Sequence, residues 1–182
     1  MSGNLKDSSG WRRNRWRILG WSFAAIMLLL PLIAMQFTNE VDWDASDFII
    51  FGVMLGTVGG AVELAARMTP DKAYRTATGV ALAAAFILIW INGAVGIIGN
   101  EENPANLMYF GVLVVGIIGS VMARFQPGGM ARAMVATAIA QILIAVIALV
   151  AGLGSTIAVT VIFVLLWLTS AWLFKAASDK PN

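Results

Sequence analysis

Long apolar stretches alternate with short polar turns along the whole chain, and this pattern predicts six membrane-spanning helices. Most stretches are about 20 residues long, the length that an α-helix needs to cross the hydrocarbon layer. The last apolar run, from Met130 to Phe174, would as one helix be about twice as long as the hydrocarbon layer is thick. We therefore divide it at the turn sequence Gly152-Leu153-Gly154-Ser155. The predicted spans are residues 18–37, 48–68, 76–98, 107–125, 131–151 and 156–174.

The predicted fold is all-α, a polytopic helix bundle. One transmembrane domain covers residues 18–174, between a cytoplasmic basic arm of residues 1–17 and a tail of residues 175–182. The arm interleaves Arg12, Arg13, Arg15 and Arg17 with two tryptophans, which is typical of an anchor at the lipid headgroups. Twin-arginine export and a cleaved signal peptide are the alternatives. The first span exceeds a signal-peptide core and no A-x-A-like site follows it, so we expect a retained helix.

The charged residues support this division and predict an orientation. All 12 lysines and arginines lie in the arm, in the turns after the second and fourth spans, or in the tail. The turns after the first and third spans carry acidic residues and no basic ones. Because basic loops stay on the cytoplasmic side, we expect both termini to be cytoplasmic.

Several turns contain residues that favour helix starts. Ser46 or Asp47 is a candidate N-cap for the second span, and Thr69-Pro70 and Asn103-Pro104 each resemble a cap followed by an N1 proline. Gln126-Pro127-Gly128-Gly129 is a turn by composition.

Composition indicates a membrane protein and excludes several kinds of chemistry. The chain of 182 residues is 59% hydrophobic and only 12% charged, whereas about a quarter of a soluble domain is charged. It has no cysteine and no histidine, which are the usual ligands of haem, iron–sulfur clusters, copper and zinc. We therefore expect no cofactor, and only carboxylate-bound Ca²⁺ or Mg²⁺ stays chemically possible.

The chain resembles itself at an offset of 59 residues. Phe51-Gly52-Val53 matches Phe110-Gly111-Val112, and Gly60 matches Gly119. This favours three tandem helical hairpins, with chance similarity between membrane helices as the alternative. Parallel repeats occur in transporters, but a repeat alone does not decide function.

One stripe of the second span combines small residues with two charges. Gly52, Gly56, Gly60, Glu63 and Arg67 share one face of the helix. We expect the glycines, together with Gly111 and Gly119 in the repeat, to pack closely against neighbouring helices. Glu63 is either a proton or cation site or the acidic member of a structural ion pair with Arg67, and we favour the pair because acid-before-base at this spacing is stabilising.

Two uncharged polar residues lie within later spans. Gln141 is near the middle of the fifth span, and Asn92 is in the outer third of the third span. Each could line a solute path, but we favour an interhelical hydrogen bond for both.

The acidic residues of the two acidic turns are a candidate cation vestibule: Glu40, Asp42, Asp44, Asp47, Glu101 and Glu102. Asp42-x-Asp44 resembles the start of a Ca²⁺ loop, but the glycine and the distal glutamate of such a loop are missing. We favour roles in topology and helix capping.

The segments AMQFTNEVDWDASDF (residues 34–48) and WINGAVGIIGNEENPANLMYFGVL (residues 90–113) resemble those of a family of small, uncharacterised bacterial inner-membrane proteins. The resemblance implies a location in the bacterial plasma membrane.

No residue set suited to catalysis is evident, since nucleophile–base combinations and paired intramembrane carboxylates are absent. We expect a non-enzymatic inner-membrane protein that acts through helix packing, as a self-associating or accessory subunit. The alternative is a small solute or ion transporter with an internal polar path. Expected partners are the lipid bilayer and a second copy or another membrane protein, and not nucleic acid.

Overall fold

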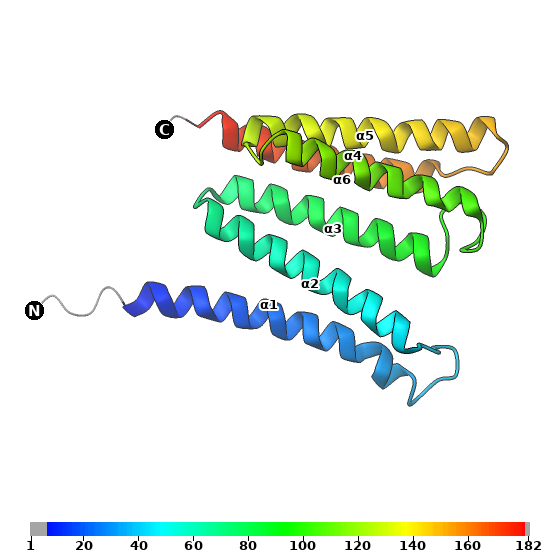
Figure 1. Cartoon of the computed structure of the whole chain (residues 1–182), viewed down its shortest axis with the longest axis horizontal. Helices are drawn as coiled ribbons and strands as arrows, with labels where there is room; N and C mark the ends of the chain where they lie inside the picture. The colour runs from blue at the N-terminus through cyan, green and yellow to red at the C-terminus, as the bar shows by residue number, and fades with distance from the viewer. Residues whose placement is uncertain (1–6, 181–182) are drawn as a thin grey trace, which may run out of the picture. The chain divides into compact units, whose positions relative to one another are not determined.

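The computed structural model describes residues 7–180, and it describes the backbone alone for residues 7–14 and 16. Within this range the chain forms six α-helices and one short 3₁₀ helix, with no strand, which confirms the predicted all-α fold (Figure 1). The elements are α1 (Asp7–Ala34), α2 (Ala45–Met68), α3 (Lys72–Ala94), η1 (Pro104–Leu107), α4 (Met108–Met122), α5 (Pro127–Val150) and α6 (Ile157–Ser178).

Each of the six helices is long and apolar enough to cross a membrane, with η1 and α4 counted as one span. The protein is therefore a multi-pass membrane protein, as the hydropathy pattern predicts. The chain divides into two compact units, Met1–Leu64 (unit 1) and Ala65–Asn182 (unit 2).

Unit 1 is a helical hairpin of α1 and most of α2, joined by the first acidic turn. None of the side chains from Arg17 to Ala34 is buried, and α1 meets α2 through Arg17, Trp21 and Leu28. At the acidic turn, the Trp43 ring packs edge-on against Phe48 and Phe51, with centroid distances of 5.3 and 5.4 Å.

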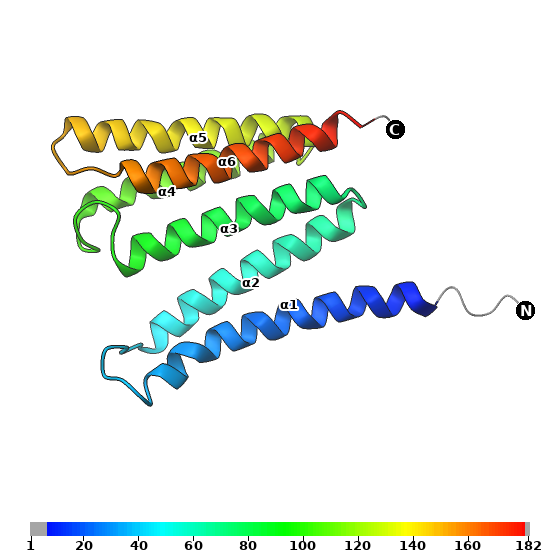
Figure 2. The same cartoon turned by 180° about the vertical axis from the view of Figure 1, so that it is seen from behind.

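Unit 2 is a four-helix bundle. α5 lies along one side, α4 and α6 lie next to it on opposite faces of the unit, and α3 packs against α6 (Figures 1 and 2). The core consists mainly of alanine and large apolar side chains, with Leu88, Tyr109, Phe163 and Phe174 almost fully buried. Small residues let α4 and α5 approach closely, because a Cβ atom placed on Gly119 would lie 2.9 Å from the Cβ of Ala133.

Several helix boundaries differ from the predicted ones. α1 begins at Asp7, so helix continues through much of the segment predicted as an arm. α3 ends at Ala94, four residues before the end of the predicted span, because the following segment forms a loop in which Gly96 has φ +73°. α4 ends at Met122 because Arg124 and Phe125 adopt left-handed backbone conformations.

Two predictions about helix starts are wrong. The N-cap of α3 is Asp71, whose carboxylate accepts from the Tyr74 N–H at 2.9 Å, so Thr69-Pro70 lies outside the helix. The segment Gln126–Gly129 is not a turn, because Pro127 is the first residue of α5. Its glycines serve close packing instead: a Cβ atom on Gly129 would lie 2.6 Å from the Cβ of Ala123.

Candidate functional site

The one acid within the second span, Glu63, joins the two helices of unit 1. Its Oε1 atom lies 2.6 Å from Nη2 of Arg17, and its Oε2 atom accepts from the indole N–H of Trp21 at 3.5 Å. The side chain of Glu63 is 19% exposed and that of Arg17 is 50% exposed, so the pair is only partly shielded from its surroundings. The structure therefore gives Glu63 an ion-pair partner on α1, a helix that the sequence argument did not consider. Arg67 lies one turn further along α2, on its exposed surface.

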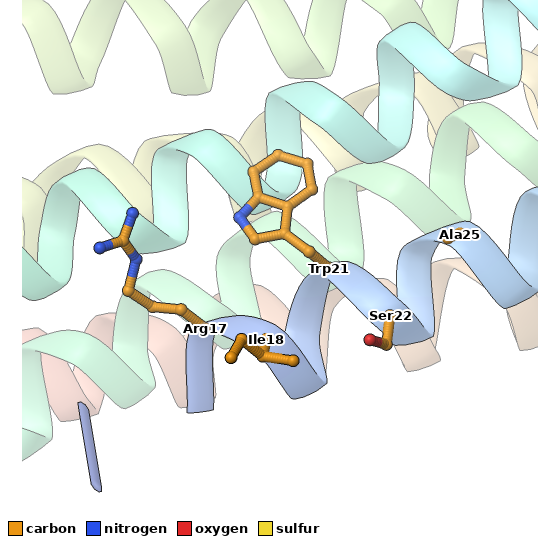
Figure 3. A pocket seen from close by; sticks show the side chains of 5 residues that line it. All are labelled: Arg17, Ile18, Trp21, Ser22 and Ala25. Carbon is orange, nitrogen blue, oxygen red and sulfur yellow. The ribbon is translucent and has the colours of Figure 1, made fainter. Parts of the chain in front are cut away.

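An open groove runs along α1 beside this ion pair. It has a volume of about 470 Å³ and is lined by Arg17, Ile18, Trp21, Ser22 and Ala25 (Figure 3). Arg17 and Trp21 extend from α1 in the direction of α2, whereas Ser22 and Ala25 have short side chains that leave the groove open. Charge is confined to its Arg17 end, and the rest of the lining is apolar or weakly polar.

The predicted packing glycines behave differently from one another. A Cβ atom on Gly52 would meet Leu28 at 3.9 Å, and Gly119 touches Ala133, so these two lie at helix contacts as predicted. Gly56, Gly60 and Gly111 have open space instead, since a Cβ atom there would meet no described atom within 4 Å. Gly59, which was not among the predicted glycines, also lies at a contact, because a Cβ atom placed on it would lie 3.3 Å from the Trp21 ring.

The open glycines of α2 and the groove of α1 lie on the same side of the hairpin. The face of α2 that contacts α1 holds Gly52, Gly59 and Glu63, and Gly56 and Gly60 are turned from it in one direction at about 100° per residue. The other groove residues, Ile18, Ser22 and Ala25, are turned from the contact face of α1 in the same rotational sense. Because the helices are antiparallel, equal rotations lead to the same side of the pair. Unit 1 therefore has one side with small side chains on both helices.

The acidic residues of the first turn cap α2. Asp44 accepts from the N–H groups of Ser46 at 2.7 Å and Asp47 at 3.1 Å, and the Asp47 carboxylate accepts from the Asp44 N–H at 3.0 Å. This reciprocal arrangement is a capping box, with Asp44 as the cap in place of the predicted Ser46 or Asp47. The hydrogen bond from the Ser46 hydroxyl, followed by those from the two backbone N–H groups, lowers the pKa of Asp44 below its ordinary value.

The second acidic turn is organised by an amide. The Asn106 side chain is buried; it accepts from the N–H groups of Ile97 at 3.0 Å and Ile98 at 2.8 Å, and it donates to the carbonyl of Asn100 at 2.6 Å. Glu101 and Glu102 lie in this loop with exposed side chains. In the part of the chain that the structure describes, no group of three or more acidic side chains is placed to hold a metal ion.

Gln141 is completely buried in unit 2, and neither its amide oxygen nor its amide nitrogen has a hydrogen-bond partner among the described residues. The predicted interhelical hydrogen bond is therefore absent. Asn92 is also buried and donates to the Asn106 carbonyl at 3.0 Å, but its oxygen is unpaired. The other buried polar groups of the described chain without a partner are the hydroxyls of Tyr109, Thr156 and Thr160 and the indole N–H of Trp167.

The buried polar groups near the start of α3, the start of α5 and the end of α6 are paired. The Tyr74 hydroxyl donates to the Phe125 carbonyl at 2.8 Å, the Ser170 hydroxyl donates to the Ala77 carbonyl at 2.9 Å, and the Thr137 hydroxyl donates to the Ala133 carbonyl at 2.9 Å. At the end of the bundle, Lys180 forms an ion pair with Asp71 at 2.5 Å. The hydrogen bond from Lys180, together with the one from the Tyr74 N–H, lowers the pKa of Asp71.

Sequence reasoning missed the partners Arg17 and Trp21, the loop residue Asn106 and the buried Trp167. Asn106 follows Asn103-Pro104 in a polar turn, which is a signal for turn chemistry that could have found it. Arg17 and Trp21 are residue types that are common as anchors at the membrane interface, so nothing in the sequence links them to Glu63. The anchoring prediction for Arg12, Arg13, Trp11 and Trp16 concerns side chains outside the described residues.

The chain matches no protein family model, no curated protein and no solved structure.

Proposed function

We propose that this protein is a non-enzymatic, multi-pass protein of the bacterial inner membrane that packs its helices against a second copy of itself or another membrane protein. The observation that carries this proposal is the open side of the α1–α2 hairpin, where Gly56 and Gly60 meet no atom within 4 Å beside the α1 groove. Helices in a membrane associate through such small residues because their backbones can approach closely.

In this proposal both termini face the cytoplasm. Arg67, Lys72 and Arg75 lie in the helix ends on either side of the α2–α3 turn, and the turn from α4 to α5 carries Arg124 with Arg132 nearby. The other two turns between α1 and α4 carry acidic residues and no basic ones. This distribution of charge supports the orientation through the positive-inside rule.

A second copy is the simplest occupant of the open side, because one surface pairing with itself gives a closed two-fold contact. The test is energy transfer between labelled copies in liposomes, comparing the parent with Gly56→Leu/Gly60→Leu. A Cβ atom at either position would meet no described atom within 4 Å, so the fold should persist while self-association weakens tenfold or more, equivalent to about 1.4 kcal/mol.

The matched control is Gly20→Leu. Gly20 also has no atom within 4 Å, but it is turned to the other side of α1 from the groove, so this variant should associate like the parent. Unchanged association of the double variant would contradict the proposed surface. A parent that stays monomeric at every protein-to-lipid ratio would exclude a second copy as the partner.

A small solute or ion transporter is the second candidate, and the unpaired polar atoms inside unit 2 favour it. Flux of protons and alkali cations into proteoliposomes is the relevant measurement, made on the parent, Glu63→Gln and Gln141→Leu. Transport by the parent that either variant abolishes would replace our preferred function. A parent without flux would weaken this second candidate.

A further inference from the structure

Unpaired polar atoms in unit 2 gather in one half of the bundle. The described chain has seven such buried side-chain atoms, on Asn92, Tyr109, Gln141, Thr156, Thr160 and Trp167. Each buried polar group without a partner typically costs about 1–3 kcal/mol, and membrane interiors offer no bulk water to relieve the cost. Six residues with this defect in one small bundle therefore call for a common physical explanation.

Gln141 and Trp167 lie at the same depth near the middle of the bundle. A Cβ atom on Gly128 would lie 3.1 Å from the Ser178 hydroxyl, which aligns the start of α5 with the end of α6. At 1.5 Å per residue, Gln141 is about 20 Å and Trp167 about 17 Å from this level. Both side chains are buried in the same four-helix unit, so an amide and an indole N–H share one layer of the core.

The remaining unpaired groups continue from this layer toward the α3–α4 loop. The Ser170–Ala77 hydrogen bond aligns α6 with α3, and from that level Thr160 is about 15 Å, Thr156 about 21 Å and Asn92 about 22 Å away. Tyr109 is buried and is the second residue of α4, directly after the α3–α4 loop, so it lies at the same end of the bundle. The series runs along about half of the bundle.

Rearrangement within the protein does not satisfy the two central groups. A threonine hydroxyl can rotate to bond a carbonyl of its own helix, as Thr137 does. A direct hydrogen bond from the Trp167 indole N–H to the Gln141 amide oxygen would still leave the Gln141 amide nitrogen without an acceptor. Buried water is the usual partner of polar groups in this situation, and each water makes about three hydrogen bonds. The amide oxygen, the amide nitrogen and the indole N–H supply three partners in one layer.

We propose that bound water molecules occupy the interior of unit 2 as a column from the α3–α4 loop to the middle of the bundle, ending at Gln141 and Trp167. All contributing side chains are uncharged, so the site suits water better than an ion. The column ends where the polar groups become paired, at Thr137 and Ser170. The proposal holds for either proposed function, since it concerns hydration and not transport.

Radiolytic hydroxyl-radical footprinting of the full-length protein in lipid nanodiscs tests this column. Radicals form from bound water and oxidise the side chains beside it, and mass spectrometry locates the oxidised residues. After correction for intrinsic reactivity, Trp167 and Tyr109 should react at least tenfold faster than Phe163 and Phe174, which are as deeply buried. Equal corrected rates for the four aromatic residues would overturn the proposal without any variant.

A pair of substitutions locates the inner end of the column. Gln141→Leu should reduce Trp167 oxidation at least threefold, because it removes two of the three polar atoms in that layer. Thr137→Val changes a buried residue one turn away whose hydroxyl is already paired, so Trp167 oxidation should stay at the parental rate. Equal effects of the two variants, or no effect of Gln141→Leu, would contradict the assignment of water to Gln141.

Discussion

Unit 1 and unit 2 are built from helices of similar hydropathy, yet nearly all buried side chains belong to unit 2. In unit 2, glycines of α4 and α5 meet alanine, threonine and serine side chains on neighbouring elements, and the backbones come close together. In unit 1, α1 contacts α2 through Arg17, Trp21 and Leu28. These side chains are long, and atoms far from the α1 backbone make the contacts. An apolar composition is therefore not enough to bury side chains between two helices. Small residues on both helices are also needed, because they let the backbones approach.

The helices α2 and α4, which the predicted repeat aligns with each other, show the same difference at single positions. Gly60 and Gly119 correspond in the predicted repeat, but only Gly119 is covered, by Ala133 of α5. Gly52 and Gly111 correspond as well, and here it is Gly52 that has a neighbour, Leu28. If the repeat reflects duplication, its copies use their shared glycines at different contacts.

The largest effect should come from the loop that closes the core of unit 2. Asn106→Ala leaves the N–H groups of Ile97 and Ile98 without their acceptor, and we expect it to lower the free energy of unfolding by about 3 kcal/mol. Unfolding in SDS, followed by circular dichroism, measures this. The control Asn103→Ala removes one helix cap at Ala105 and should cost about 1 kcal/mol. Equal losses would mean that Asn106 does no more than an ordinary cap.

The corresponding glycines of α2 and α4 should respond in opposite directions to a methyl group. Gly119→Ala forces a Cβ atom against Ala133 and should destabilise unit 2 by about 1–3 kcal/mol. Gly60→Ala meets no atom and should stabilise α2 by about 0.5–1 kcal/mol through helix propensity. The same unfolding assay measures both variants. A loss of stability in Gly60→Ala would show that this face of α2 is already covered within one chain.

The smallest effect should be the acid response of the turn in unit 1. The pKa of Asp44 is lowered by folding, so its contribution to stability is fully present above the ordinary aspartate pKa and is lost as the pH falls through the lowered value. Hydrogen-exchange protection of the Ser46 and Asp47 amides, corrected for intrinsic rates, should decline at acidic pH. In Asp44→Asn this decline should be smaller, and an identical decline would assign it to another group.

The number and approximate positions of the helices could be predicted because apolar runs of about 20 residues have few alternatives. The cap at Asn103-Pro104 was also predictable, although it opens the 3₁₀ helix η1 before α4. The ends of the helices were harder to predict. Arg124 and Phe125 adopt left-handed backbone conformations, and neither residue type signals that conformation in the sequence.

The contacts of the candidate residues could not be predicted in the same way. These helices are apolar on most sides, so the sequence does not show which face meets which neighbour. For Glu63, sequence spacing suggested Arg67 as a partner, but it could not suggest Arg17, which comes close only through the antiparallel packing of α1 on α2. The polarity and depth of Gln141 were evident from its position, but its lack of a partner depends on the residues of the neighbouring helices.

The ion pair between Asp71 and Lys180 joins the first turn of α3 to the segment that follows α6. The beginning and the end of the four-helix bundle are thus neighbours. A short linker between them would allow the bundle to be circularly permuted, with new ends opened in the α4–α5 connection. Domains whose ends meet in this way also accept insertion into other proteins. Unit 2 has the geometry of a transferable module, onto which a different hairpin could be joined in place of α1 and α2.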